Sequence, residues 1–138
     1  MSEKPFVSES RFRVRYAETD AMRIVHHSSY IVWFEEGRSE YMRQVGFPYS
    51  RLESMGYYLA VTEVKARYLR AAKYDEEVIV RTTVASVRSR GVTFRYQVLR
   101  AANGELLAEG ESVHVCIDDD GRPRRLPKEV TELIGRYA

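Results

Sequence analysis

The feature that most limits the possible folds is a single long helical pattern in a chain whose other regular segments resemble strands. Tyr30, Phe34, Gly37, Tyr41 and Val45 recur at helical spacing and form one stripe. No second helical pattern of this length follows. A core must then form by packing a sheet against this one helix, which indicates an α+β fold.

The limits of this helix are indicated by its flanking residues. Ser28 or Ser29 can cap its start, because a serine hydroxyl accepts a hydrogen bond from a free N–H of the first turn. Gly46 suits the position after its last residue, Val45, since glycine tolerates positive φ. Residues 31–34 are all apolar, so we expect the first half of the helix to be covered on most sides.

Strand patterns precede and follow the helix. Phe12, Val14 and Tyr16 alternate with arginines, which predicts a first strand that ends at Ala17. Four further strands are expected at residues 57–70, 77–89, 92–101 and 105–117, and a short final helix at 127–137. The order predicts a five-stranded antiparallel sheet wrapped around the long helix.

Local patterns make two finer predictions about the last strands. Asn103 and Gly104 both tolerate positive φ, which predicts a type I′ hairpin turn. In residues 113–117 three aliphatic side chains alternate with His114 and Cys116, and we expect the aliphatic ones to face the core. Cys116 has no basic neighbour in the sequence, so a catalytic thiol is not expected.

Composition narrows the class of protein. The 138 residues suit one domain spanning 1–138, and the net charge of +2, from 22 basic and 20 acidic residues, is too weak to indicate a nucleic-acid partner. A single cysteine cannot form an internal disulfide. No apolar run approaches the roughly 20 residues that span a bilayer, and the N-terminus lacks a signal-peptide pattern. We therefore expect a cytoplasmic protein without a membrane span.

A five-stranded layer around one helix leaves two unpaired strand edges and an uncovered helix end. Pairing of edges between two copies would cover both. The fold prediction therefore includes a homo-oligomer.

A polar segment lies directly before the apolar helix. It contains Glu18, Thr19, Asp20, His26 and His27, a density of chemical groups that a simple connector does not need. Two adjacent histidines without further ligands at zinc-site spacing do not predict a metal, and no cofactor is expected. Glu18 reads as a solvated charge and Thr19 as a turn residue. The segment as a whole predicts an active site.

The segment and much of the chain resemble the hotdog-fold acyl-CoA thioesterases. The resemblance rests on "YAETD", on "VHHSSY" and on the helix "IVWFEEGRSEYMRQVGF", with later matches in "ARYLRAAKYDEEVIVRT", "GVTFRYQVLR", "NGELLAEGESVHVCID" and "DGRPRRLP". The most similar branch includes 4-hydroxybenzoyl-CoA thioesterase and the Tol-Pal-associated acyl-CoA thioesterase. It implies hydrolysis of acyl-CoA to a free acid and CoA, in a dimer or a tetramer of dimers with active sites at the dimer interface.

The resemblance also implies the catalytic groups. It assigns the catalytic carboxylate to Asp20, which acts either as a general base on water or as a nucleophile through a mixed anhydride. It points to the backbone N–H of His27 as an oxyanion donor, and to the His27 side chain as a group that orients the substrate or the carboxylate. Independently, a helix start presents free N–H groups and a partial positive charge to a developing oxyanion.

Other residues are candidates for shaping the acyl pocket. Tyr16 and Tyr30 are expected to line it or to donate a hydrogen bond, although both positions are also typical of core residues. Glu35, Glu36 and Glu40 are rivals to Asp20, because a second hotdog branch uses a carboxylate of the central helix. The rest of that branch's pattern is missing, so Asp20 ranks above them.

Coenzyme A carries phosphates, which basic side chains bind. Arg88, Ser89 and Arg90 stand where related enzymes contact the nucleotide end of CoA, and Arg70 and Lys73 are further candidates. Acyl carrier protein is an alternative carrier, since its acidic surface could dock on these arginines.

Two positions depart from the family pattern. Arg23 stands where the family usually has glycine, and Ser29 where it usually has asparagine. If that glycine adopts positive φ, an arginine strains the loop or forces another path. This departure keeps a second class of function open, a protein that binds acyl thioesters without hydrolysing them.

Overall fold

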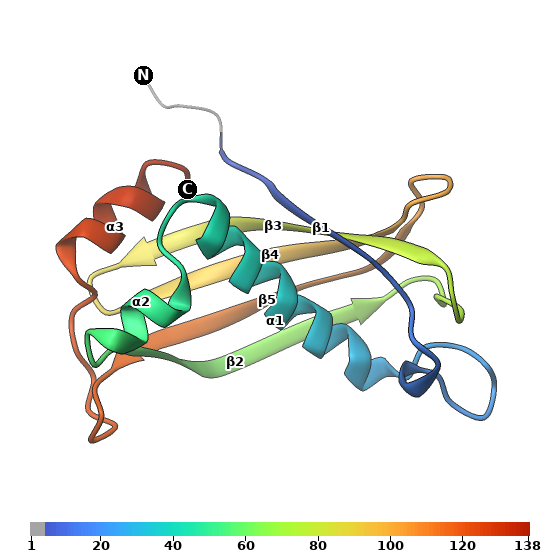
Figure 1. Cartoon of the computed structure of the whole chain (residues 1–138), viewed down its shortest axis with the longest axis horizontal. Helices are drawn as coiled ribbons and strands as arrows, with labels where there is room; N and C mark the ends of the chain where they lie inside the picture. Colours follow the sequence, from blue (N-terminus) through green and yellow to red (C-terminus); the bar gives the residue numbers. More distant parts are fainter. Residues whose placement is uncertain (1–4) are drawn as a thin grey trace.

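The computed structural model describes residues 5–138 and contains one five-stranded antiparallel sheet with a long helix across one face (Figure 1). The sheet order is β1-β3-β4-β5-β2. The strands are β1 (Ser8–Arg13), β2 (Tyr58–Tyr68), β3 (Glu77–Arg88), β4 (Gly91–Arg100) and β5 (Leu106–Ile117). The helices are α1 (His27–Gln44), α2 (Tyr49–Ser54) and α3 (Lys128–Gly135), with a 3-10 turn η1 (Tyr16–Glu18). The predicted α+β architecture is confirmed.

The core lies between α1 and the sheet. The Phe34 ring of α1 stacks on Tyr96 of β4, with centroids 4.5 Å apart. Gly37 brings the helix close to β3, because a Cβ at this position would lie 2.5 Å from Thr82 Oγ1. Gly46 ends the helix with φ 91°, as predicted. Val32 is half exposed, so the first half of α1 is less covered than we expected.

The first strand is shorter than predicted. It ends at Arg13 instead of Ala17, and Tyr16 lies in η1 with 77% of its surface exposed. Val14 still bonds to the chain before β3, since its N–H donates to Glu76 O at 2.9 Å. The chain then turns because the N–H of Arg15 donates to the Glu18 carboxylate at 2.7 Å.

The predicted facing of β5 is wrong. Its register places Ser112 opposite Phe94, and residues directly opposite each other share a face of the sheet. Because Phe94 points into the core, Ser112, His114 and Cys116 do as well, and all three are buried. The aliphatic side chains of 113–117 lie on the other face. Apolar side chains occur on both faces of this strand, so alternation alone could not decide between them.

The hairpin between β4 and β5 forms at the predicted place with a different turn. Gly104 has φ 73°, but Asn103 does not have positive φ, so the turn is not type I′. Instead the Asn103 side chain accepts a hydrogen bond from Glu105 N–H at 3.0 Å, and Gly104 N–H donates to Arg100 O at 2.8 Å. The asparagine therefore closes the turn through its side chain.

Two strands form the edges of the sheet, β1 and β2. On β2, Val61, Val64 and Tyr68 are each more than a third exposed. Within residues 5–138, no helix is long and apolar enough to cross a lipid bilayer.

Candidate active site

The loop between β1 and α1 lies at one end of the sheet, beside the start of α1 (Figure 1). It closes on itself: Asp20 N–H donates to Ile24 O at 2.9 Å, and Arg23 N–H donates to Asp20 O at the same distance. It is also attached to the segment before β3, because Val25 N–H donates to Ala72 O at 2.9 Å. The polar segment singled out in the sequence is thus an ordered loop.

Asp20 lies half-buried within this loop. Its Oδ1 accepts a hydrogen bond from Met22 N–H at 2.8 Å, which fixes the carboxyl group to its own turn. No donor in residues 5–138 binds Oδ2. One carboxylate oxygen is therefore held by the protein and the other is available to a water molecule or a substrate.

The start of α1 is capped by histidine and not by serine as predicted. His26 is the cap: its Nδ1 accepts from Ser28 N–H at 3.2 Å and its carbonyl accepts from Ser29 N–H at 2.9 Å. In the described part of the chain, the N–H of His27 donates to no acceptor. This N–H, the one that the resemblance points to, is therefore free to receive an oxyanion.

The two histidine rings lie at the surface. His26 and His27 have ring centroids 4.2 Å apart, and Tyr68 at the end of β2 lies edge-on to the His27 ring at 6.3 Å. The Tyr68 hydroxyl donates to His27 O at 3.1 Å. Sequence reasoning missed Tyr68, because its contact joins positions far apart in the chain and no local pattern signals it.

Arg23 occupies the left-handed region with φ 66°. The loop therefore takes the path that a glycine would permit, and the arginine adopts the strained conformation. Its side chain is exposed. Of the two possibilities that the sequence left open, the structure shows strain at Arg23.

The two candidate tyrosines have different surroundings. Tyr16 is exposed and packs edge-on against Tyr74, with centroids 5.6 Å apart. Tyr30 is 3% exposed, and its hydroxyl accepts from Ala72 N–H at 3.2 Å. Burial raises the pKa of Tyr30. The Tyr30 hydroxyl thus supports the segment that holds the loop, whereas Tyr16 lies at the surface.

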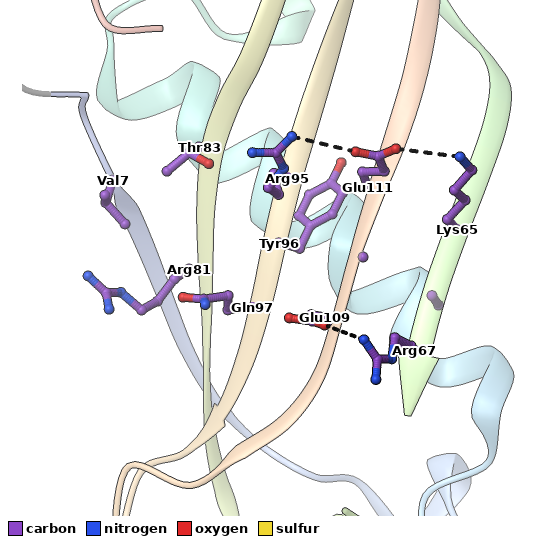
Figure 2. A pocket seen from close by; sticks show the side chains of 12 residues that line it. Val7, Lys65, Arg67, Arg81, Thr83, Arg95, Tyr96, Gln97, Glu109 and Glu111 are labelled. Carbon is purple, nitrogen blue, oxygen red and sulfur yellow. Dashed lines mark ion pairs between the residues drawn. The ribbon is translucent and has the colours of Figure 1, made fainter. Parts of the chain in front are cut away.

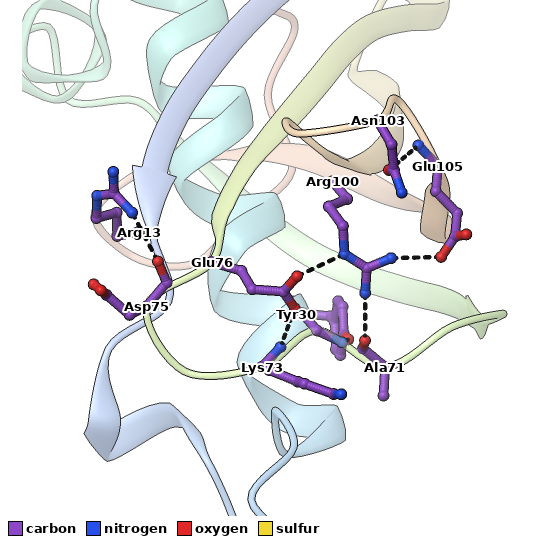
Figure 3. A network of polar contacts seen from close by, with 10 residues as sticks. Arg13, Tyr30, Ala71, Lys73, Asp75, Glu76, Arg100, Asn103 and Glu105 are labelled. Carbon is purple, nitrogen blue, oxygen red and sulfur yellow. Dashed lines mark hydrogen bonds and ion pairs between the residues drawn. The ribbon is translucent and has the colours of Figure 1, made fainter.

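That segment is fixed by Arg100, at the end of β4 (Figure 3). Arg100 Nη2 donates to Ala71 O at 2.9 Å, and its Nε pairs with Glu76 at 2.7 Å. Glu76 in turn accepts from Lys73 N–H at 2.7 Å. Burial alone would raise the pKa of Glu76, but the hydrogen bonds from Arg100 and Lys73 outweigh it and lower the pKa.

The basic candidates fall into two groups. Lys73 forms a β-bridge with Ile24, so it lies beside the loop. Arg88, Ser89 and Arg90 are exposed at the turn between β3 and β4, at the other end of the sheet. Within one chain the structure therefore does not bring this turn to Asp20. Arg70 is exposed where β2 leads into the segment before β3.

The helix carboxylates lie outside the loop. Glu35, Glu36 and Glu40 line a hollow of about 470 Å³ between β1 and α1, and both Glu36 and Glu40 pair with Arg43. A second hollow, of about 710 Å³, lies on the sheet face turned away from α1, where charged side chains of β2, β4 and β5 pair with one another (Figure 2). Asp20 lines neither hollow.

Comparison with known proteins places this geometry in a family. The model of the thioesterase-like superfamily matches residues 14–134. The putative acyl-CoA thioesterase YneP of Bacillus subtilis is 35% identical over 83% of this chain and 82% of its own length. The acyl-CoA thioester hydrolase YbgC of Escherichia coli is 32% identical, over 86% and 88%. The solved structure of a DHNA-CoA thioesterase from Staphylococcus aureus superposes with a TM-score of 0.87 at 31% identity, over 95% of this chain and 88% of that one. The chain belongs to the thioesterase-like superfamily.

Proposed function

We propose that this protein is an acyl-CoA thioesterase, which hydrolyses an acyl-CoA thioester to a carboxylic acid and CoA. The observation that carries the proposal is the pairing, around one short loop, of a carboxylate with a free oxygen and a helix start with a free N–H. These are the groups that thioester hydrolysis requires. The related proteins named acyl-CoA thioesterases support the same substrate class.

The reaction follows from these two groups. The thioester carbonyl oxygen accepts a hydrogen bond from the N–H of His27. At this place the positive end of α1 stabilises the negative charge as it develops on the oxygen. Asp20 either takes a proton from the attacking water or attacks the carbonyl carbon itself. A C–O bond forms, the C–S bond breaks, and the CoA thiolate leaves and is then protonated. On the nucleophile route, water hydrolyses the resulting anhydride.

A second copy completes the site in this proposal. If two β2 edges pair antiparallel, the Tyr68 end of one strand lies beside the Tyr58 end of the other. The Tyr58 end is near the β3–β4 turn, because Leu59 pairs with Cys116, whose N–H donates to Arg90 O at 2.7 Å. Arg88, Ser89 and Arg90 of one copy would then face the loop of the other and bind the CoA phosphates. The proposal includes a homodimer, alone or within a tetramer.

A cytoplasmic location is also part of the proposal. Its support is the single cysteine, Cys116, which is buried and unpaired in a chain that needs no oxidising compartment.

The test is CoA release from short, long and aromatic acyl-CoAs, followed with a thiol-reactive dye. We expect wild type to turn over at least one of them, and Asp20→Asn to lose at least about a hundredfold in kcat, because the amide cannot act as a base. Asp75→Asn is the matched control, an exposed aspartate in the neighbouring segment that should keep wild-type activity. Equal rates for wild type and Asp20→Asn would remove Asp20 from the mechanism.

An acyl carrier protein thioester is a second candidate substrate. It is favoured by the exposed arginines of the β3–β4 turn, to which an acidic carrier surface could bind. Measuring kcat/KM for the same acyl group on CoA and on the carrier protein decides between them. Tight binding of both without release of thiol would instead support a protein that binds acyl thioesters without hydrolysing them.

A further inference from the structure

Glu18 is a buried carboxylate between the loop and α1. Its side chain is 8% exposed. The Trp33 indole N–H of α1 donates to Oε2 at 2.7 Å, and Arg15 N–H donates to Oε1 at 2.7 Å. The Arg15 guanidinium adds an ion pair at 3.2 Å. Burying a charge is costly unless such partners compensate, and here they do.

These partners keep Glu18 charged. Burial alone would raise the pKa of Glu18, but the hydrogen bonds from Arg15 and Trp33, together with the Arg15 charge, outweigh it and lower the pKa below its ordinary value. The interpretation of Glu18 as a solvated loop charge does not fit this environment.

The backbone carbonyl of Glu18 holds the other side of the loop. It accepts from His26 N–H at 2.8 Å and from the Ser29 hydroxyl at 3.3 Å. One residue therefore binds α1 through its carboxylate and the helix cap through its carbonyl. Asp20 follows Glu18 by two positions, and His27 follows His26 directly.

We propose that Glu18 is a positioning residue for thioester hydrolysis: by bonding to Trp33, Arg15, His26 and Ser29 it sets the place of Asp20 relative to the His27 N–H. This inference rests on the proposed function above. A base and an oxyanion donor act on the same carbonyl group, so their separation must be kept to well within an ångström. A displacement of about 1 Å can cost roughly a hundredfold in rate.

The first variant is Glu18→Gln, which keeps the volume of the side chain. A carboxamide offers one oxygen where the carboxylate offered two, so Trp33 and Arg15 can no longer both find an acceptor. We expect kcat to fall about ten- to a hundredfold, while KM for acyl-CoA stays within about twofold, because the groups that bind CoA are untouched. Loss of kcat with KM retained distinguishes positioning from a general loss of structure.

The second variant, Trp33→Phe, removes the donor and keeps an aromatic ring. We expect kcat to fall here as well. The fold loss of kcat in the double variant should be smaller than the product of the two single losses, because both changes break the same contact between Trp33 and Glu18. Trp33 is the only tryptophan of the chain, so its indole N–H gives a single proton resonance. In Glu18→Gln this resonance should move, which reports the contact independently of activity.

Tyr96→Phe is the matched control. It removes a buried hydrogen bond between the Tyr96 and Ser112 hydroxyls, on β4 and β5. This bond lies in the core and does not involve the loop. We expect Tyr96→Phe to lower the Tm by several degrees and to leave kcat unchanged.

The outcomes separate this inference from the proposed function. The positioning role is supported if wild type is active and Glu18→Gln has a reduced kcat with an unchanged KM. The positioning role is overturned if wild type is active and kcat is unchanged in both Glu18→Gln and Trp33→Phe. It is also overturned if Tyr96→Phe lowers kcat as much as these two variants do. In either case the proposal of a thioesterase is unaffected. Wild type inactive on every acyl thioester overturns both. If Glu18→Gln does not fold, Trp33→Phe decides alone on the same criteria.

Discussion

Single side chains determine how the loop meets the helix. His26 caps α1 with both its ring nitrogen and its carbonyl, which accept hydrogen bonds from the N–H groups of Ser28 and Ser29. Within residues 5–138 the N–H of His27 donates to no acceptor. Arg23 takes a backbone conformation usually left to glycine. Conformations of this kind persist only where surrounding contacts hold them, and here the contacts on both sides of Arg23 close the loop.

His114 is a second residue whose surroundings decide its chemistry. It is buried beside Ser112, whose hydroxyl lies 2.7 Å from His114 Nε2. Burial, and then the positive charge of Arg38, lower the pKa of His114 from 6.5 to about 4, against a smaller opposing effect from the Leu59 backbone. The folded protein therefore favours neutral His114.

A pH dependence of stability follows from this shift. Because the folded pKa lies below the unfolded one, the stabilisation is complete above about pH 6.5 and is lost as the pH falls toward 4. The loss should reach about 3 kcal/mol by pH 4. Urea unfolding across this range measures it, with His114→Gln as the comparison. We expect the unfolding free energy of the variant to change less steeply with pH than that of wild type. Identical slopes in the two proteins would contradict the assignment to His114.

At the scale of elements, the pattern of α1 was sufficient to predict the architecture, because α1 is the one long helix of the described residues and five other segments are strands. The short polar segment before the helix predicted where the site lies, and the resemblance to the hotdog thioesterases assigned Asp20 and His27 as its residues. Glu18, Tyr68 and Arg100 were not predicted as site residues. Their roles depend on contacts between segments far apart in the chain, which a local pattern does not contain.

The contacts of Arg100 give a prediction at this scale. Arg100→Gln removes the ion pair with Glu76 and the bond to Ala71 O, and so loosens the segment that holds Val25. We expect a loss of about 2 kcal/mol in unfolding free energy and a lower kcat. Urea unfolding and CoA release measure the two effects.

A control for this variant exists at the opposite end of the sheet. Arg124 pairs with Asp118 at the same N–O distance of 2.7 Å, but it is about half exposed. Arg124→Gln should lower the unfolding free energy much less than Arg100→Gln does, because exposed ion pairs contribute little to stability, and it should leave kcat unchanged. If both variants reduce kcat equally, Arg100 has no special connection to the loop.

At the scale of the whole molecule, the open edge of β2 and the distance between Asp20 and the β3–β4 turn point to the same arrangement. An edge strand with exposed apolar side chains favours pairing with another chain. Pairing of two β2 strands would bring the basic turn of one copy to the loop of the other. The oligomer and the CoA site are thus one proposal.

Val64→Glu tests that proposal. Val64 is 39% exposed on β2, and two glutamates brought together across a pair of β2 edges would repel each other. We expect sedimentation to show a monomer and CoA release to fall at least about tenfold, the scale of an added barrier near 1.4 kcal/mol. Val32→Glu is the control, an exposed valine on α1 that should leave both unchanged. A Val64→Glu dimer with full activity would contradict pairing through β2.

The attachment of the loop at Val25 to Ala72 also has a consequence for how the protein is made. Ala72 is synthesised after α1, α2 and β2, so the bond from Val25 to Ala72 cannot form until all three have left the ribosome. Arg100, which secures Ala71, comes later still, at the end of β4. Closing such long stretches of chain is slow compared with forming a helix. The chemistry of this chain is therefore acquired among the last steps of its folding, and a nascent chain that ends before β4 has the residues of the site without its geometry.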